Sequence, residues 1–368
     1  MNRKIYIAFA AALTMFAACS EHPIDPVPQV PDSSHSYIFF EPEVVETVAT
    51  RAAFHSGTAL PIPTGENDHS DEFGVLGYYN GSSLFSSYTN PQDIALVYRA
   101  GSDFSYYTYD NLAIWQKETT EGKDNAHHFF AFYPYSIYGT VQANGGSPQI
   151  SYTLPSTEDD MVDILTAYQS HSSKVQNVGL EFYHRLWALD FVIANNQTNN
   201  PYNPTTGAPS QTLSVVSAKI TLKDVPGTGT LSINEGRSVS VASRKNQIFT
   251  LKERSSNTPT GDVVIDSEDE VCYGPLLLFP TDVTSSNNTF KVQYRIDMEL
   301  RNPWGTEYKF SYPATEGAYA DFKTGLTSFE AGKRYSLKVT KGNGENFTVS
   351  VNENIPWDGE VDVDHTFN

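Results

Sequence analysis

The sequence predicts an all-β protein, and three observations support this fold class. Aromatic residues make up 13% of the 368 residues, with 22 Tyr and 21 Phe, and such side chains favour the pleated surface of a sheet. Apolar and polar residues alternate from Phe290 to Leu300, which is the period of a half-buried strand. Further short alternating runs recur between turn residues, and this spacing is typical of sandwiches and barrels.

The first 18 residues have the layout of a secretory signal peptide. Arg3 and Lys4 precede an uncharged stretch from Ile5 to Ala18, which is too short for a membrane span of about 20 residues. Ala17-Ala18-Cys19 resembles the bacterial lipobox, where the signal peptide is cut and the thiol carries lipid. Cys19 is therefore the expected lipidation site, in an exported outer-membrane lipoprotein precursor. Ordinary cleavage at small residues that lie near a Cys is the alternative.

The second cysteine, Cys272, would have no partner if Cys19 is acylated. A disulfide framework and a cysteine-based zinc site are then excluded. We expect Cys272 to be a small buried apolar side chain.

The charge balance argues against a nucleic-acid partner. The chain has 43 acidic and 24 basic residues, a formal net charge of −19. Such a field repels phosphate backbones and disfavours docking on anionic lipid through a basic surface. The expected contact with the outer membrane is therefore the lipid on the precursor.

Residues 19–51 are interpreted as a lipidated tether and a cleavable leader. Four prolines in 20–36 favour an extended tether. The apolar run from Tyr37 to Val48 predicts a strand broken at Pro42. Arg51 is the only basic residue between Lys4 and Arg99, and small neighbours make it a site for an Arg-specific protease. The residues chosen to represent the leader strand are Tyr37, Phe39, Val44 and Val48.

The rest of the chain is divided at a polar, turn-rich stretch. Residues 196–212 are predicted to be a linker between an amino-terminal β-sandwich (52–195) and a carboxy-terminal one (213–368). From Leu180 to Ile193 the apolar alternation slips by one residue, which predicts a β-bulge or a crossing between sheets near Leu186.

No motif points to catalysis, so no enzyme, cofactor or metal site is predicted. The sequence holds no G-x-S-x-G, H-E-x-x-H or P-loop. His127 and His128 are adjacent on a predicted strand, so they point to opposite faces and cannot chelate together. His184 is expected to be a hydrogen-bonded core histidine. The acidic clusters around Asp71, Asp160 and Asp269 lack EF-hand spacing and are expected to be solvated loops, with weak calcium binding as the alternative.

Several segments together resemble the fimbrillin family of Bacteroidales surface pilins, which form type V pili. Their order and spacing carry the resemblance, which covers nearly the whole chain. The segments are Thr50-Arg51-Ala52, Phe73-Gly-Val-Leu-Gly-Tyr-Tyr79, Phe129-Phe-Ala-Phe-Tyr-Pro134, Asp160-Met-Val-Asp-Ile-Leu-Thr-Ala167, Phe182-Tyr-His-Arg-Leu186, Phe329-Glu-Ala-Gly-Lys-Arg-Tyr335 and Ile355-Pro-Trp-Asp-Gly359.

The resemblance implies two tandem transthyretin-like β-sandwich domains behind the signal peptide and leader. It also implies a lipoprotein that an Arg-specific protease cuts between Arg51 and Ala52, followed by polymerisation with other pilin subunits through strand exchange. The mature form would lie on the cell surface in a fimbria, with a role in adhesion to a host or bacterial ligand.

The strand that would be donated has a candidate at the end of the chain. Val361, Val363 and Phe367 alternate with polar residues, and His365 has the same phase. The alternative is that 360–367 is the edge strand of its own domain. Stalk, tip and accessory positions remain open.

Two other functions remain as alternatives. A monomeric surface lipoprotein could bind glycans through aromatic platforms such as Tyr106, Tyr107 and Tyr109. A secreted glycoside hydrolase would need a carboxylate pair whose separation the sequence does not reveal.

Overall fold

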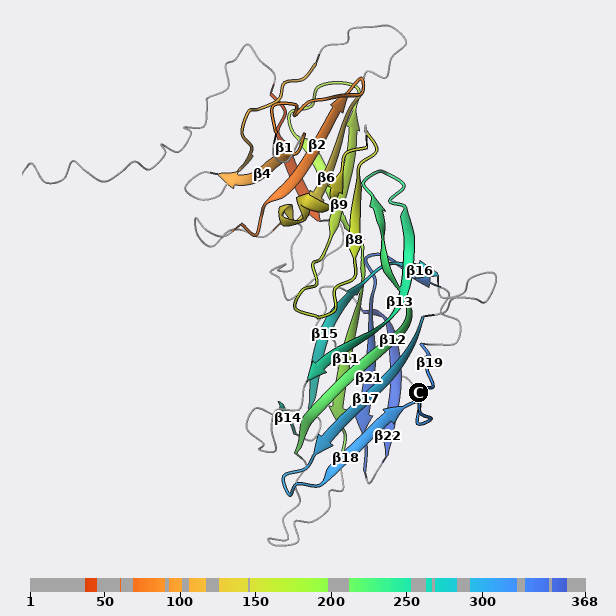
Figure 1. The fold of residues 1–368 in the computed structure, drawn as a ribbon. Coiled ribbons are helices and arrows are strands. Elements are labelled where there is room, and N and C mark those ends of the chain that lie inside the picture. Colours follow the sequence, from red (N-terminus) through yellow and green to blue (C-terminus); the bar gives the residue numbers. More distant parts are fainter. Residues whose placement is uncertain are drawn as a thin grey trace, which may run out of the picture. The chain divides into compact units, whose positions relative to one another are not determined.

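The structure is a computed structural model. It consists of two compact units, Met1–Tyr37 and Ile38–Asn368. Of the first unit, only Tyr37 is described. The described residues are 37–44, 60, 69–89, 93–100, 106–116, 126–144, 146–197, 212–252, 263–266, 269–282, 292–322, 328–343 and 346–355. All of the sheets below belong to the second unit, and the fold is all-β as predicted (Figure 1).

The first sheet has eight strands in the order β1-β10-β9-β6-β2-β4-β5, with β3 paired to β2. Its strands come from the first half of the chain. They are β1 (Phe40–Val44), β2 (Phe73–Tyr79), β3 (Ser82–Ser83), β4 (Ala95–Ala100), β5 (Tyr106–Thr108), β6 (His127–Tyr133), β9 (Leu165–His171) and β10 (Val178–His184).

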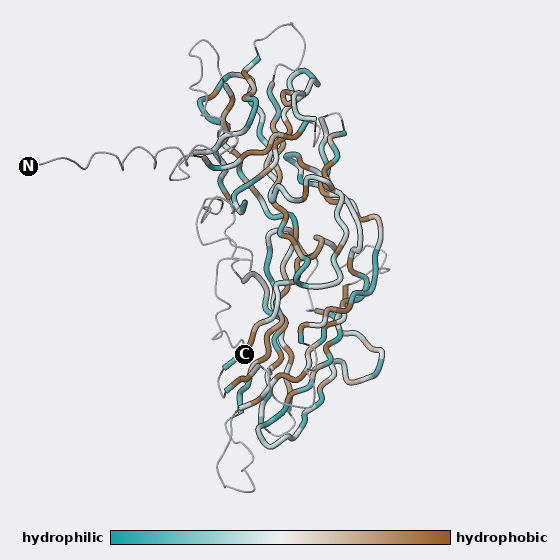
Figure 2. The backbone as a smooth tube through the Cα atoms, turned by 60° about the vertical axis from the view of Figure 1, so that its left-hand side comes forward, coloured by the Kyte–Doolittle hydropathy of each residue, from teal (hydrophilic) through white to brown (hydrophobic). Residues whose placement is uncertain are grey.

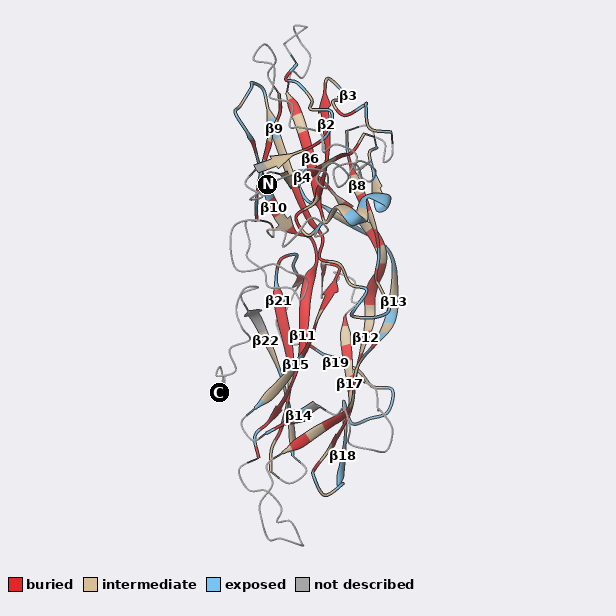
Figure 3. Ribbon diagram, turned by 90° about the vertical axis from the view of Figure 1, so that its left-hand side faces the viewer, coloured by how far each residue is buried: buried red, intermediate tan, exposed pale blue. Residues whose placement is uncertain are grey.

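The second sheet has four strands in the order β15-β11-β21-β22. They are β15 (Glu270–Leu278), β11 (Trp187–Asn195), β21 (Arg334–Lys341) and β22 (Phe347–Ile355). Every residue of β11 is buried (Figure 3), because the strand lies inside the sheet and packs against the core.

The third sheet is built around the long strand β12 (Leu213–Ser232) and follows the order β18-β17-β12-β8-β7. Its other strands, and the minor elements, are β7 (Val141–Gln142), β8 (Gln149–Thr153), β13 (Val239–Lys252), β14 (Val263–Ile265), β17 (Gln293–Arg301), β18 (Glu307–Tyr312), β19 (Ala320–Asp321), the pair β16 (Thr281–Asp282) and β20 (Ser328–Phe329), and a 3-10 turn at Tyr135–Thr140. Side chains of the second and third sheets share one hydrophobic core. Figure 2 shows hydrophobic and hydrophilic residues interspersed along the described backbone.

The alternation predicted at Phe290–Leu300 is confirmed as a half-buried strand over Gln293–Arg301, whereas Phe290 and Lys291 lie outside the described residues. In β17, Tyr294, Ile296, Met298 and Leu300 are all buried. The strand turns into β18 through Asn302, whose side-chain oxygen accepts the backbone N–H groups of Trp304 (3.1 Å) and Thr306 (2.8 Å).

The predicted crossing near Leu186 is also confirmed. β10 ends at His184 in the first sheet, and β11 begins at Trp187 in the second. The buried Arg185 lies at the crossing. Its guanidinium donates to Thr166 Oγ1 (2.8 Å) and to the carbonyl oxygens of Ser232 (2.6 Å) and Arg237 (2.7 Å).

This crossing has a consequence for the expected linker at 196–212. Strand β11 precedes the linker yet pairs with β15 and β21, and β8 pairs with β12. The chain passes from the first sheet to the second at Arg185, where the apolar phase changes, and strands on both sides of the polar stretch contribute to the second and third sheets.

Cys272 is exposed, so the expectation of a buried thiol is wrong. It lies on β15, an edge strand of the second sheet, and neighbouring strand residues point to opposite faces. Tyr273 takes the inward face and is 8% exposed, which leaves the thiol outside.

Across the described ranges, the chain has no helix whose length and apolar character would let it cross a membrane.

Candidate functional site

Strand β1 lies at the edge of the first sheet and pairs with β10 in parallel. The register runs from Phe40 opposite Val178 to Val44 opposite Phe182. The Val178 N–H donates to the Phe39 carbonyl oxygen at 2.8 Å. A segment near the amino terminus therefore completes a sheet whose other strands come from later in the chain.

One face of β1 is buried and the other is exposed. Pro42 is buried, and Ile38, Phe40 and Val44 are 0%, 4% and 3% exposed, whereas Glu41 and Glu43 face solvent. Exposing one such apolar side chain costs about 1.5–3 kcal/mol. The strand therefore closes part of the core of the first sheet.

Phe40 packs into an aromatic pocket of that core. Its ring centroid lies 5.5 Å from that of Phe129, 5.6 Å from that of Tyr109 and 6.4 Å from that of Phe85. These rings come from β6 and from two loops, so the pocket is built by parts of the chain outside the leader.

The predicted break at Pro42 is wrong, because the strand runs through it. Parallel pairing uses the backbone groups of alternate residues, and Phe39 has the phase that faces β10. Ile38 has the opposite phase, and its N–H donates to the Ala113 carbonyl oxygen at 3.0 Å. Pro42 shares the phase of Ile38, so its missing N–H removes no bond to β10, as is usual for proline in an edge strand.

Residues 109–116, which we call the strap, hold the start of β1 on the side away from β10. Besides the Ala113 contact, the Tyr109 hydroxyl donates to the Ile38 carbonyl oxygen at 2.8 Å and accepts the Ala113 N–H at 3.2 Å. Burial raises the pKa of Tyr109, so the hydroxyl keeps its proton and remains a donor. Both backbone groups of Ile38 are therefore bonded to the strap.

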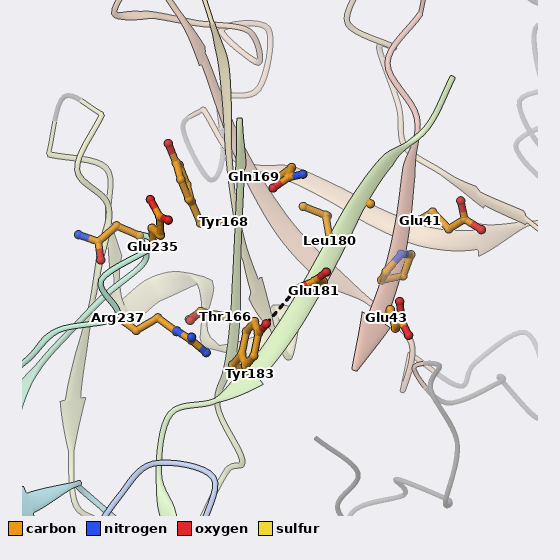
Figure 4. Close-up of a pocket in the computed structure, with 13 residues that line it drawn as sticks. Glu41, Glu43, Thr166, Tyr168, Gln169, Leu180, Glu181, Tyr183, Glu235 and Arg237 are labelled. Carbon is orange, nitrogen blue, oxygen red and sulfur yellow. Dashed lines mark hydrogen bonds between the residues drawn. The ribbon is translucent and has the colours of Figure 1, made fainter. Parts of the chain in front are cut away.

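The outer face of β1 and its neighbours forms one side of a groove of about 700 Å³ (Figure 4). The turn between β12 and β13 forms the other side. The lining residues are Glu41, Pro42, Glu43, Thr166, Tyr168, Gln169, Gly179, Leu180, Glu181, Tyr183, Asn234, Glu235 and Arg237.

The tyrosine rings of this groove already have partners. The Arg237 guanidinium lies 3.7 Å from the Tyr183 ring centroid, and the Tyr183 hydroxyl donates to Glu181 at 2.9 Å. The Tyr168 ring packs 5.1 Å from that of Phe130, and its hydroxyl bonds with His128 Nδ1 at 2.9 Å. Stacking of a sugar on either ring would have to compete with these contacts.

The predicted leader residues lie in different environments. Val44 is on the buried face of β1, whereas Tyr37 and Phe39 are half-buried. The inward residues Ile38 and Phe40 are not in the predicted set. The exposed Glu41 and Glu43 show which residues of β1 face solvent. This signal in the sequence could have identified Ile38, Phe40 and Val44 as the inward residues. The other predicted site residues, which are Cys19, Val48, Arg51, Ala52, Val361, Val363 and Phe367, lie outside the described residues.

The histidines behave as core and sheet residues. His184 is 2% exposed and its Nδ1 lies 2.9 Å from an oxygen of Asp163, which confirms a hydrogen-bonded core histidine. His127 is buried and His128 half-buried on the other face of β6, so the expected opposite orientation is also confirmed.

Several described residues of the three acidic clusters bond within the protein, and Asp71 is only 2% exposed, so the expectation of a solvated loop is wrong for this residue. Asp71 accepts the Arg99 N–H at 2.6 Å, and Glu158 accepts the Gly274 N–H at 3.2 Å. Glu270 pairs with Lys338 at 2.9 Å. Within the described part of the chain, no three His, Cys, Asp or Glu side chains gather as a metal site would require.

The tyrosines considered for sugar stacking are largely occupied. Tyr109 is 3% exposed, and the Arg99 guanidinium lies 4.7 Å from the Tyr107 ring centroid. The side chain of Tyr106 lies outside the described residues.

The chain is similar to solved structures of Bacteroides proteins described as cell adhesion or fimbrial proteins. Two are candidate cell adhesion proteins, from Bacteroides uniformis (12% identity) and Bacteroides ovatus (14% identity). Each aligns at a TM-score of 0.45 over 87% of this chain and 98% of the other. A fimbrial protein from Bacteroides ovatus aligns at 13% identity and a TM-score of 0.36, over 84% of this chain and 50% of its own.

Among the curated proteins, none matches this sequence. A family model described as Fimbrillin-like matches residues 50–356, which is most of the chain. On this evidence, the chain belongs to the fimbrillin-like family.

Proposed function

We propose that the protein is a structural subunit of a cell-surface fimbria that is exported as a lipoprotein. Cleavage after Arg51 removes the leader, including β1, and the vacated edge of β10 accepts a strand from another subunit. The observation that carries this proposal is the docking of β1, which is buried on one face and which, among the described strands, pairs with β10 at the edge of the sheet.

The energetics of β1 explain why its removal would create a binding site. Loss of the strand uncovers the walls around Ile38, Phe40 and Val44 and leaves the backbone groups of β10 unpaired. Unpaired backbone groups and exposed apolar surface are both costly, and an added strand satisfies both. Before cleavage, β1 occupies the same edge and prevents assembly.

The tail at 360–367 is a candidate for the incoming strand. Its apolar residues Val361, Val363 and Phe367 have the two-residue period that a one-sided slot requires. The alternative is that this tail serves as an edge strand in its own domain.

Further features complete the proposal. Lipid on Cys19 would hold the precursor at the outer membrane, and the mature form would lie on the cell surface with other pilin subunits. The two sandwiches would have the transthyretin-like topology that the sequence resemblance implies. Stalk, tip and accessory positions are all compatible with it.

The test is treatment of the purified precursor with an Arg-specific protease. We expect a mature chain that begins at Ala52 and forms higher-order species on a gel and by light scattering. Arg51→Ala should block the conversion, whereas Arg254→Ala should not. A chain cut at Arg51 that stays a stable monomer would contradict polymerisation. Saturable glycan binding by the uncut form would instead favour the monomeric lectin.

A further inference from the structure

The strap joins the leader strand to a buried histidine. At one end, Tyr109 and Ala113 bond to both backbone groups of Ile38. At the other end, the Gln116 N–H donates to His127 Nε2 at 3.0 Å. The segment that holds the leader is thus fixed to β6 by a titratable side chain.

The direction of this hydrogen bond determines the protonation state of His127. A backbone N–H can only donate, so Nε2 must carry a lone pair and the imidazole must be neutral. His127 is 3% exposed, and a proton on Nε2 would face the Gln116 N–H with little room for water between them.

The groups around His127 come from four parts of the chain. The ring centroid of Tyr79 of β2 lies 4.5 Å from that of His127, and that of Trp115 of the strap lies at 4.7 Å. His171 of β9 lies directly opposite His127 in the strand register. His128 follows His127 in the chain and lies on the other face of β6. Burial lowers the pKa of His127, and the same cause lowers that of His171.

The same aromatic cluster reaches the leader. Trp115 lies 6.0 Å from Phe129, and Phe129 lies 5.5 Å from Phe40, between ring centroids. A displacement of the strap at Trp115 and Gln116 would therefore disturb Phe40 as well as Ile38.

We propose that the strap is an acid-sensitive latch on the leader strand, in which protonation of His127 releases Gln116 and frees Ile38. The latch acts on the docking of β1 against β10, which is the site of the proposed function. Its biological role rests on that proposed function.

The sign follows from the neutral histidine. In the closed state the imidazole resists protonation, whereas in the open state its pKa is the ordinary value of about 6.5. The closed state is therefore fully favoured above this pH and loses stability as the pH falls below it. At pH 5 the open population should rise by up to about 30-fold, the ratio for one imidazole that binds a proton only when open.

The test is hydrogen exchange of the full chain with the leader attached, at pH 7.5 and pH 5. After correction for intrinsic rates, the protection factor of residues 38–44 should fall at pH 5, while that of β21 should stay constant. In His127→Gln the amide oxygen can still accept from Gln116 but does not titrate, so the fall should disappear. His128→Gln is the matched control and should keep it.

Two results would overturn the latch. One is equal protection of residues 38–44 at the two pH values in the unaltered chain, and the other is a fall that persists in His127→Gln. If that variant does not fold, nitrogen NMR of the unaltered chain decides, because a proton on Nε2 of His127 at pH 7.5 contradicts the bond. A precursor that shows the fall but never polymerises after cleavage would support the latch and contradict the proposed function.

Discussion

Glu43 of β1 lies directly opposite Glu181 of β10 in the parallel register, and both side chains are exposed. Like charges at directly opposed positions destabilise strand pairing. The leader is therefore held by its apolar face and by the strap, and its polar face opposes that docking.

We predict that Glu43→Gln strengthens the docking of β1 by about 0.2–1 kcal/mol, because it removes this repulsion. Urea unfolding of the precursor at low salt measures the change, which should shrink at high salt. Glu41→Gln is the control. Glu41 lies opposite Gly179 and accepts from Asn177 at 3.4 Å, so no gain is expected there.

Phe40→Ala should destabilise the precursor by about 3–5 kcal/mol, because it empties the pocket formed by Phe85, Tyr109 and Phe129. Thermal or urea unfolding of the uncut chain measures this loss. Phe39→Ala is the matched variant, since Phe39 is only half-buried, and it should cost much less. Equal losses in the two variants would contradict the observed phase of β1.

Gly74→Ala should destabilise the first sheet by about 1–3 kcal/mol, because an added Cβ would lie 2.1 Å from the Phe132 ring. Gly179→Ala offers the contrast, since its Cβ would meet nothing within 4 Å, and we expect a neutral or slightly stabilising effect. Denaturation midpoints of the two variants test the pair. A tolerated Gly74→Ala would mean that β2 and β6 pack less closely than the structure has them.

Arg185→Ala should cost about 3 kcal/mol, because a fully buried side chain is removed and the buried Thr166 hydroxyl and the carbonyl groups of Ser232 and Arg237 lose their donor. The comparison is Glu307→Gln, which weakens a pair with Arg301 near the surface and should cost less than about 1 kcal/mol. Urea unfolding with probes in the first and third sheets measures whether the two still unfold together. A small loss in Arg185→Ala would show that water replaces the guanidinium.

The regular parts of the fold could be predicted from local patterns, and the leader docking only in part. The alternation at β17 and the slip at Leu186 follow directly from the positions of apolar side chains. The four residues Tyr37–Phe40 are all apolar, so period two is hidden there, and Glu41 and Glu43 are needed to find it.

Other features depend on tertiary position rather than on local pattern. A proline interrupts most strands because it lacks a backbone N–H. At Pro42 that N–H would point away from β10, since β1 is an edge strand, so no bond between the strands is lost. Cys272 is exposed because it has the outward phase on β15, opposite to that of the buried Tyr273. The strap has no alternating strand pattern. Its role comes from individual hydrogen bonds to Ile38 and His127, which hydrophobic periodicity cannot predict.

The parallel pairing of β1 with β10 also affects the order in which the protein can fold. Strand β1 is synthesised first, but its partner residue Val178 lies more than a hundred residues after Phe40. Contacts between such distant segments form slowly, and strand edges that wait for a partner are prone to wrong pairing. Until β10 is made, the edge of β1 has no partner and is open to any compatible strand, so a chain still being synthesised would be vulnerable to pairing with a neighbouring chain.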